Sequence, residues 1–186
     1  EIAGAEWTGS TYHGFIFDGA AVTHIAPPAG YHEIDFGDIA DNGVVVGSAT
    51  DRVSNTAIAL MIVENDMLLL PPLDGFDTSY AKGVNGSGLV IGTCQMTGTP
   101  ETPVATLWDD GVPFDLNDLV RNGVGWTLRS ASDINSDDQI VGWGINPDGV
   151  QRGFVLTPVP EPASTAVIII VSMVGTQCRH RVRASL

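Results

Sequence analysis

The feature that most constrains the fold of this chain is an internal repeat. Segments 30–47, 75–92 and 125–142 align without gaps, and the first and last glycines of each lie 17 positions apart. The copies share an aromatic residue after the first glycine, a branched residue nine positions after that glycine, a polar turn, and an apolar triplet before the last glycine. Self-similarity at intervals of a few tens of residues predicts a row of similar units in place of one irregular core.

Each copy predicts two strands joined by a hairpin. The bends are rich in Asn, Asp and Gly, which tolerate positive φ and close tight turns, and they are residues 41–43, 85–87 and 136–138. The apolar triplets that follow, which we expect to pair within their units, are residues 44–46, 89–91 and 139–141. The glycines that we expect to close equivalent strands are Gly47, Gly92 and Gly142.

A second pair of strands is predicted between these modules. The segments that carry it are residues 13–25, 56–70, 104–116 and an unfinished copy at 152–156. Successive repeat glycines, starting from Gly4, lie 43, 45 and 50 residues apart. About four short strands in a repeat of this length are typical of β-propeller blades. We therefore predict an all-β, propeller-like array over residues 1–157, with a stack or sandwich of hairpins as the alternative.

We expect this array to be incomplete. Ile2, Ala3 and Gly4 match the end of a repeat unit, so the chain begins inside an earlier copy. Three full copies are too few for a closed ring, which has about 4 to 8 blades. We therefore expect an N-terminally truncated domain, with further blades before Glu1.

The repeats resemble a known family. Segments 84–92 and 134–142 are similar to its "IN..G.IVG" element, and the segments similar to its "HAFLW..G" element are 13–15, 105–108 and 152–154. These residues resemble the secreted bacterial repeats named after the His-Ala-Phe (HAF) tripeptide, although the tripeptide itself is intact in none of them. Residues 115–142 are similar to the closing unit of such proteins. The resemblance implies an extracellular repeat protein and carries over no catalytic residue.

The composition changes abruptly in residues 158–186. A Pro-Glu-Pro element is followed by an apolar stretch at 166–174 and then by arginines. This order closely resembles the PEP-CTERM sorting signal that exosortases process in Gram-negative bacteria. The residues of the signal are Val159, Pro160, Glu161, Pro162, Ala163 and Ser164, followed by the basic residues Arg179, Arg181 and Arg183. The resemblance implies cleavage by an exosortase-type membrane protease, after transient anchoring through the C-terminus, and an extracellular or cell-surface location.

Physical chemistry agrees with this interpretation of the tail. An apolar helix followed by arginines stops in the membrane with its basic end in the cytoplasm. Residues 163–178 would form a helix of about 24 Å, against about 30 Å of hydrocarbon, and snorkelling arginines extend its reach. We therefore predict a C-terminal transmembrane helix. The alternative is a buried C-terminal strand, which the β-branched run at 168–171 would suit.

The charge balance excludes one class of partner. The chain has 8 Lys and Arg against 22 Asp and Glu, for a net charge of −14, and residues 1–162 hold 5 basic and all 22 acidic residues, for −17. No basic stripe is available to neutralise a phosphate backbone, so we expect no nucleic acid partner. Cys94 and Cys178 are too few for a disulfide scaffold or a cysteine zinc site, and the chain has neither a G-x-S-x-G elbow nor a phosphate loop. We predict no cofactor.

Two groups of residues have the chemistry of metal ligands. Asp133, Asn135 and Asp137 are spaced like the opening of a calcium loop, but Asp138 stands where such a loop needs glycine and Gly144 where it needs glutamate. A hairpin turn with Asx hydrogen bonds explains them better, with weak calcium binding as the alternative. The second group, whose geometry nothing in the sequence fixes, is His24, His32, Glu33 and Asp35.

Aromatic residues are candidates for stacking against sugar rings or for filling the core. They are Trp7, Tyr31, Phe76, Trp108, Trp126 and Trp143. Because Tyr31, Phe76 and Trp126 occupy one equivalent repeat position, packing explains all three, and we expect Trp143 to be the exposed one.

These observations predict a non-enzymatic, exported repeat protein at the cell surface or in the extracellular matrix, associated with exopolysaccharide or biofilm. The alternative is a propeller-type carbohydrate-active enzyme whose catalytic carboxylates lie in blades before Glu1. Two carboxylates about 5 to 10 Å apart in a central pocket would favour it.

Overall fold

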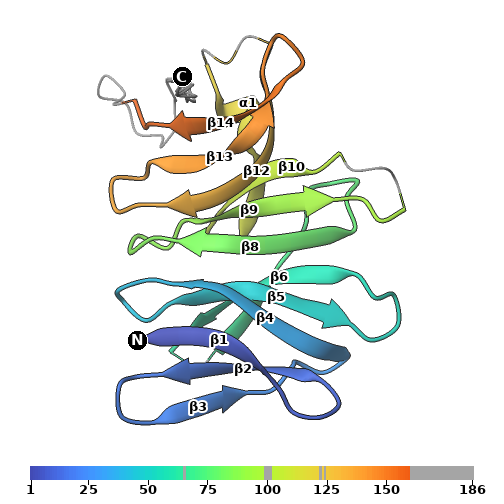
Figure 1. Cartoon of the computed structure of the whole chain (residues 1–186), viewed down its shortest axis with the longest axis vertical. Coiled ribbons are helices and arrows are strands. Elements are labelled where there is room, and N and C mark those ends of the chain that lie inside the picture. The colour runs from blue at the N-terminus through green and yellow to red at the C-terminus, as the bar shows by residue number, and fades with distance from the viewer. Residues whose placement is uncertain (65, 99–101, 122, 124, 160–186) are drawn as a thin grey trace, which may run out of the picture.

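The computed structural model describes residues 1–64, 66–98, 102–121, 123 and 125–159. These residues form short strands and one helical turn (Figure 1). In chain order the elements are β1 (Ile2–Trp7), β2 (Tyr12–Phe17), β3 (Val22–Ile25), β4 (Tyr31–Ile39), β5 (Val45–Asp51), β6 (Ala57–Val63), β7 (Asp66–Leu70), β8 (Thr78–Val84), β9 (Val90–Gln95), β10 (Val104–Asp109), β11 (Val112–Asp115), α1 (Leu116–Leu119), β12 (Thr127–Ile134), β13 (Ile140–Ile145) and β14 (Gln151–Leu156).

Within the described residues the strands form four antiparallel sheets, here called A to D in chain order. Sheet A has the order β1-β2-β3, sheet B β4-β5-β6-β7, sheet C β11-β10-β9-β8, and sheet D β12-β13-β14. Figure 1 shows them following one another along the long axis of the molecule, from sheet A at the bottom to sheet D at the top. The prediction of an all-β fold built from about four strands per repeat is confirmed.

The strand register shows that the sequence repeat is also a structural repeat. The repeat glycine stands on the second strand of each unit and pairs with the same position of the third strand. The pairs are Gly4 with Phe15, Gly47 with Leu60, Gly92 with Thr106, and Gly142 with Phe154. By this register sheet A contains the second to fourth strands of a unit, and sheet D contains the first to third.

The hairpin turns form where Asn, Asp and Gly predict them. At the bend 41–43, the Ala40 amide donates to the Val44 carbonyl at 2.9 Å. In the β10–β11 hairpin of sheet C, Asp110 and Gly111 have φ values of 51° and 77°, as a type I′ turn requires. These turns hold each pair of strands in one register.

The repeat glycines do not close strands, and this prediction was wrong. The second strands continue for several residues beyond Gly47, Gly92 and Gly142. Each of the three glycines lies opposite a β-bulge in the first strand, at Gly37, Lys82 and Ser132 respectively. The bulge pushes a carbonyl oxygen over the glycine, so that a Cβ there would overlap the backbone oxygens of Asp35, Tyr80 and Ser130. Only glycine fits beneath this carbonyl.

The hydrophobic core is divided into three layers, one between each pair of neighbouring sheets. We call the face that a sheet turns to the next sheet its front, and the opposite face its back. Because side chains alternate along a strand, Val45 on the back of sheet B joins the layer with sheet A, and Val46 on the front joins the layer with sheet C. Ile91 and Ile140 meet in the layer between sheets C and D. Every internal face is therefore covered by an equivalent sheet.

The described residues form a stack of four antiparallel sheets and contain no closed ring. Their only helix, α1, is four residues long, and none of the described helices has the length and hydropathy needed to span a membrane. The predicted span at 166–174 lies outside the described residues. The same holds for most of the sorting signal and for the basic residues, namely Pro160, Glu161, Pro162, Ala163, Ser164, Arg179, Arg181 and Arg183.

Candidate functional site

The aromatic residues at the equivalent repeat position pack against successive core layers. Tyr31 packs against the layer between sheets A and B, Phe76 against the next layer, and Trp126 against the last. Trp108 is 1 % exposed, and its Nε1 donates to the Pro71 carbonyl at 2.8 Å. These four side chains therefore stabilise the stack.

The exposed tryptophan is Trp7 and not Trp143. Trp143 is half-buried, whereas Trp7 is 57 % exposed at the end of β1. Trp7 pairs directly across the strands with Tyr12, which is 44 % exposed. The two ring centroids lie 5.1 Å apart at an angle of 57°. This tilted pair presents an apolar surface beside the β1–β2 turn.

A cavity of about 420 Å³ lies next to this aromatic pair, between sheets A and B. Tyr12 lines it together with the polar residues Glu33, Asp35 and Thr50 of sheet B. Ala5 and Ile34 form its apolar lining. An aromatic wall beside a few hydrogen-bonding groups is the usual composition of a small-molecule site.

A second cavity, of about 380 Å³, lies on the other side of the β1–β2 turn. Ser10, Thr11, His32, Arg52 and Asn55 line it. Thr11 Oγ1 and His32 Nδ1 are both buried without a hydrogen-bond partner among the described residues. Two such atoms in one wall leave donors and acceptors for a bound hydroxyl or water.

Asp51 shapes the loop that carries Arg52. Its carboxylate accepts from the amides of Val53 and Ser54 at 2.8 and 2.7 Å and from the Ser54 hydroxyl at 2.9 Å. The hydrogen bonds from Ser54 and Val53 hold the pKa of Asp51 below its ordinary value. The β5–β6 connection is thereby held in one conformation as a wall of this cavity.

The structure separates the residues of the second candidate metal group, His24, His32, Glu33 and Asp35. His24 Nδ1 lies 2.6 Å from Glu6 Oε1 on the neighbouring part of sheet A. His32 lines one cavity, and Glu33 and Asp35 line the other. Among the described residues, no three His, Cys, Asp or Glu side chains are grouped to hold a metal ion.

The candidate calcium residues form a hairpin turn. Asn135 Oδ1 accepts from the amides of Asp137 and Gln139 at 3.0 and 2.8 Å, which is Asx bonding. Asp133 Oδ1 accepts from the amide of Ile134 at 2.8 Å. Asp138 accepts from Asn85 Nδ2 of sheet C at 2.6 Å. The Asn135 oxygen thus holds the turn in its conformation, and the Asp138 oxygen joins the turn to sheet C.

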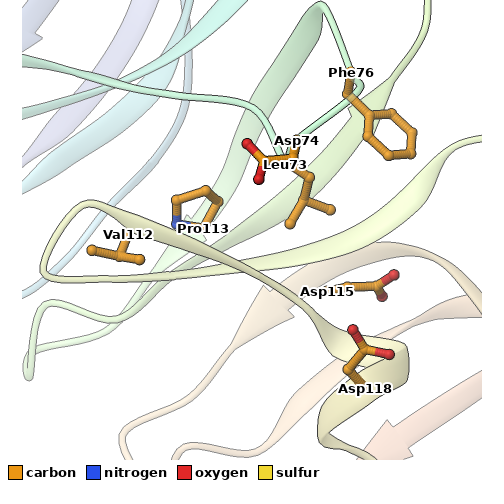
Figure 2. A pocket seen from close by; sticks show the side chains of 7 residues that line it. All are labelled: Leu73, Asp74, Phe76, Val112, Pro113, Asp115 and Asp118. Carbon is orange, nitrogen blue, oxygen red and sulfur yellow. The ribbon is translucent and has the colours of Figure 1, made fainter.

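An acidic cavity of about 460 Å³ lies at the connections of sheet C (Figure 2). Figure 2 shows Asp74 on the β7–β8 connection and Asp115 and Asp118 at the start of α1, with Phe76 and Pro113 also in the lining. Asp115 Oδ1 accepts from the backbone and side-chain nitrogens of Asn117, both at 2.7 Å, and so caps α1. At least one of the three carboxylates therefore has a structural role.

Sequence analysis missed both the Trp7–Tyr12 pair and the acidic cavity. The pairing of Trp7 with Tyr12 follows from the β1–β2 register, and a four-residue connection closed by Thr8 and Thr11 was the available signal. The acidic cavity joins two segments about forty residues apart, so no local pattern marks it.

Comparison with protein-family models, with curated protein sequences and with solved structures gave no match. The structure itself shows stacked, sequence-equivalent β-sheets with an exposed aromatic pair at the junction of the first two. Function is therefore inferred from these features and from the C-terminal sequence.

Proposed function

We propose that this chain is a non-enzymatic, exported cell-surface or extracellular-matrix protein that binds polysaccharide through the Trp7–Tyr12 surface. The observation that carries the proposal is the exposed aromatic pair beside a cavity whose lining includes Glu33, Asp35 and Thr50. Pyranose rings have apolar C–H faces that stack on indole and phenol rings, and hydroxyl edges that bond to polar groups. The Trp7–Tyr12 pair offers the first kind of contact, and polar residues for the second lie close to it.

The charge of the chain favours a neutral polysaccharide. Residues 1–162 carry a net charge of −17, which repels a polyanion at long range. Glu33 and Asp35, two of the residues that line the cavity, add local negative charge that also disfavours a polyanion. We therefore expect neutral glucans to bind better than acidic polysaccharides.

The C-terminal sequence supports export and sorting. The order of Pro160-Glu161-Pro162, the apolar stretch and the arginines is the basis for proposing an exosortase-type protease as a partner. In this proposal the chain is anchored transiently with Arg179, Arg181 and Arg183 in the cytoplasm of a Gram-negative bacterium. The sheets then lie outside the cell, where extracellular polysaccharide is available.

The binding proposal is tested with purified full-length chain in detergent micelles. Retention in gels that contain a neutral β-1,4-glucan or β-1,3-glucan is compared with retention in alginate. We expect retardation by a glucan, weaker retardation by alginate, and a loss of affinity of about tenfold or more in Trp7→Ala and Tyr12→Ala, because stacking area is removed.

Phe114→Ala is the matched control, because Phe114 is 40 % exposed on β11, away from the β1–β2 turn. This variant should bind like the unchanged chain. Retention by neither glucan, or equal retention of Trp7→Ala and the unchanged chain, would contradict the proposal.

The enzyme alternative places its catalytic carboxylates before Glu1. Three aspartates, Asp74, Asp115 and Asp118, line the acidic cavity of sheet C, but Asp115 serves there as a helix cap. No further observation in the described residues favours that alternative.

A further inference from the structure

The cavity beside the exposed aromatic pair, here called the A–B cavity, has an equivalent between sheets B and C. This B–C cavity has a volume of about 330 Å³. The repeat glycines Gly47 and Gly92 lie 45 residues apart, and the paired first strands of sheets B and C keep the same offset. Residues 45 positions apart line the two cavities, namely Glu33 and Thr78, Asp35 and Tyr80, and Thr50 and Gln95. The same place is therefore hollowed in two successive junctions of the stack.

The residues that line the B–C cavity are uncharged. Where the A–B cavity has Glu33 and Asp35, the B–C cavity has Thr78 and Tyr80. The other polar residues in its lining are Asn55, Thr56, Gln95 and Thr97. Amide, hydroxyl and phenol groups donate and accept hydrogen bonds without a net charge, and a phenol ring also offers an apolar face. This chemistry matches a neutral sugar.

Asp77, which precedes β8, holds one wall of the B–C cavity in place. Its Oδ1 accepts from the Thr97 amide at 2.7 Å and from the Thr78 hydroxyl at 3.2 Å. The hydrogen bond from the Thr97 amide is the main reason that the pKa of Asp77 lies below its ordinary value. The hydroxyls of Thr78 and Thr97 also lie 3.2 Å apart. A wall that is ordered before a ligand arrives loses less conformational freedom on binding.

The cavity lined by Thr11 and His32, here called the middle cavity, lies between the other two. It adjoins the A–B cavity through the neighbouring residues Thr11 and Tyr12, and it shares Asn55 with the B–C cavity. Figure 1 shows that β1, β5 and β9 all end on one side of the stack, where the connections that line the middle and B–C cavities begin. The three cavities therefore form a row along one edge of the stack.

The stacking of equivalent sheets does not by itself require these polar residues. At the junction of sheets C and D, the position of Thr78 is taken by Leu128, which is 1 % exposed and packs in the core layer. The position of Tyr80 is taken by Ser130, which is also buried. A junction of the same fold thus forms with a buried leucine in place of Thr78. The polar lining of the B–C cavity therefore needs a reason other than packing.

We propose that the B–C cavity is a second glycan subsite, and that one neutral glycan chain runs from the Trp7–Tyr12 surface past the middle cavity to this subsite. The inference rests on the proposed function and extends it from one contact to a row of contacts. Further contacts made by an already bound chain come without a second loss of translational freedom. Affinity should therefore rise with the length of the glycan.

The test compares glucose oligosaccharides of three and eight units, in both the β-1,4 and the β-1,3 series. Isothermal titration calorimetry with the full-length chain in detergent micelles gives the dissociation constants. The double variant Tyr80→Phe/Gln95→Ala removes two polar groups from the B–C cavity, and Trp7→Ala removes the first contact. Gln151→Ala is the matched control, since Gln151 is exposed on β14 of sheet D. Unfolding midpoints, and the two single variants, check that the double variant folds.

We expect the unchanged chain and Gln151→Ala to bind the octasaccharide of one series at least about tenfold more tightly than its trisaccharide. The double variant should bind the octasaccharide about tenfold more weakly and the trisaccharide equally well, because only the longer chain reaches the B–C cavity. Trp7→Ala should weaken both. If the double variant binds the octasaccharide as tightly as the unchanged chain, or loses affinity equally for both lengths, the second subsite is refuted. If the unchanged chain binds neither length in either series, the proposed function itself fails, and this extension with it.

Discussion

At Gly92, strand β8 carries a bulge at Lys82, and the Tyr80 carbonyl projects over the glycine. The same arrangement recurs at Gly47 and Gly142. The glycine was predictable from the repeat, but its role was not. An apolar triplet followed by glycine resembles a strand end, and only the partner strand shows that an extra residue there leaves no room for a Cβ.

Replacement of this glycine should be costly. We expect Gly92→Ala to lower the free energy of unfolding by about 3 kcal/mol, because the new Cβ would force strands β8 and β9 apart. Urea unfolding of the full-length chain, followed by circular dichroism, measures the change. Gly86→Ala is the control, since a Cβ at Gly86 meets nothing within 4 Å, and it should change stability by less than about 1 kcal/mol. Equal effects of the two substitutions would exclude the overlap as the cause.

At the scale of the elements, residues in the hairpin turns do two things: they set the register of their own hairpin, and they form hydrogen bonds to the neighbouring sheet. Asn85 Oδ1 accepts from the amides of Ser87 and Leu89 at 3.2 and 3.1 Å within its own turn. Its Nδ2 donates to Asp138 Oδ1 of sheet D at 2.6 Å. The turn was predictable because its chemistry is local. The bond between sheets was not, because it depends on which turns the stack brings together.

Asn85 and Asn146 form a matched pair for measuring the contact between sheets. Asn146 Oδ1 accepts from the amides of Asp148 and Val150 in the same pattern, and the side-chain hydrogen bonds of Asn146 all lie within this exposed turn. We expect Asn85→Ala to cost about 2 to 3 kcal/mol, because Asn85 is 4 % exposed and its loss leaves buried groups unpaired. Asn146→Ala should cost about 1 kcal/mol or less. Thermal and urea unfolding measure both, and similar losses would show that the bond between sheets contributes little.

At the scale of the whole molecule, the repeat predicted the all-β class and the order of the hairpins, because strand alternation and turn residues are properties of short stretches of sequence. It did not predict the exposed Trp7–Tyr12 pair, or that Trp143 is half-buried. Exposure of a ring depends on which neighbouring strands cover it, and no local sequence pattern carries that information.

We propose above that the stacked sheets belong to an exported protein that loses its C-terminal tail. The measurement that tests it most directly is the intact mass of the protein recovered from its native host. We predict a mature chain that ends near Pro160-Glu161-Pro162, and a longer, membrane-bound form when these three residues are replaced by alanine, whereas Pro27→Ala/Pro28→Ala in the β3–β4 connection should be processed normally. Recovery of the unchanged protein with Arg183 still attached would contradict the claim.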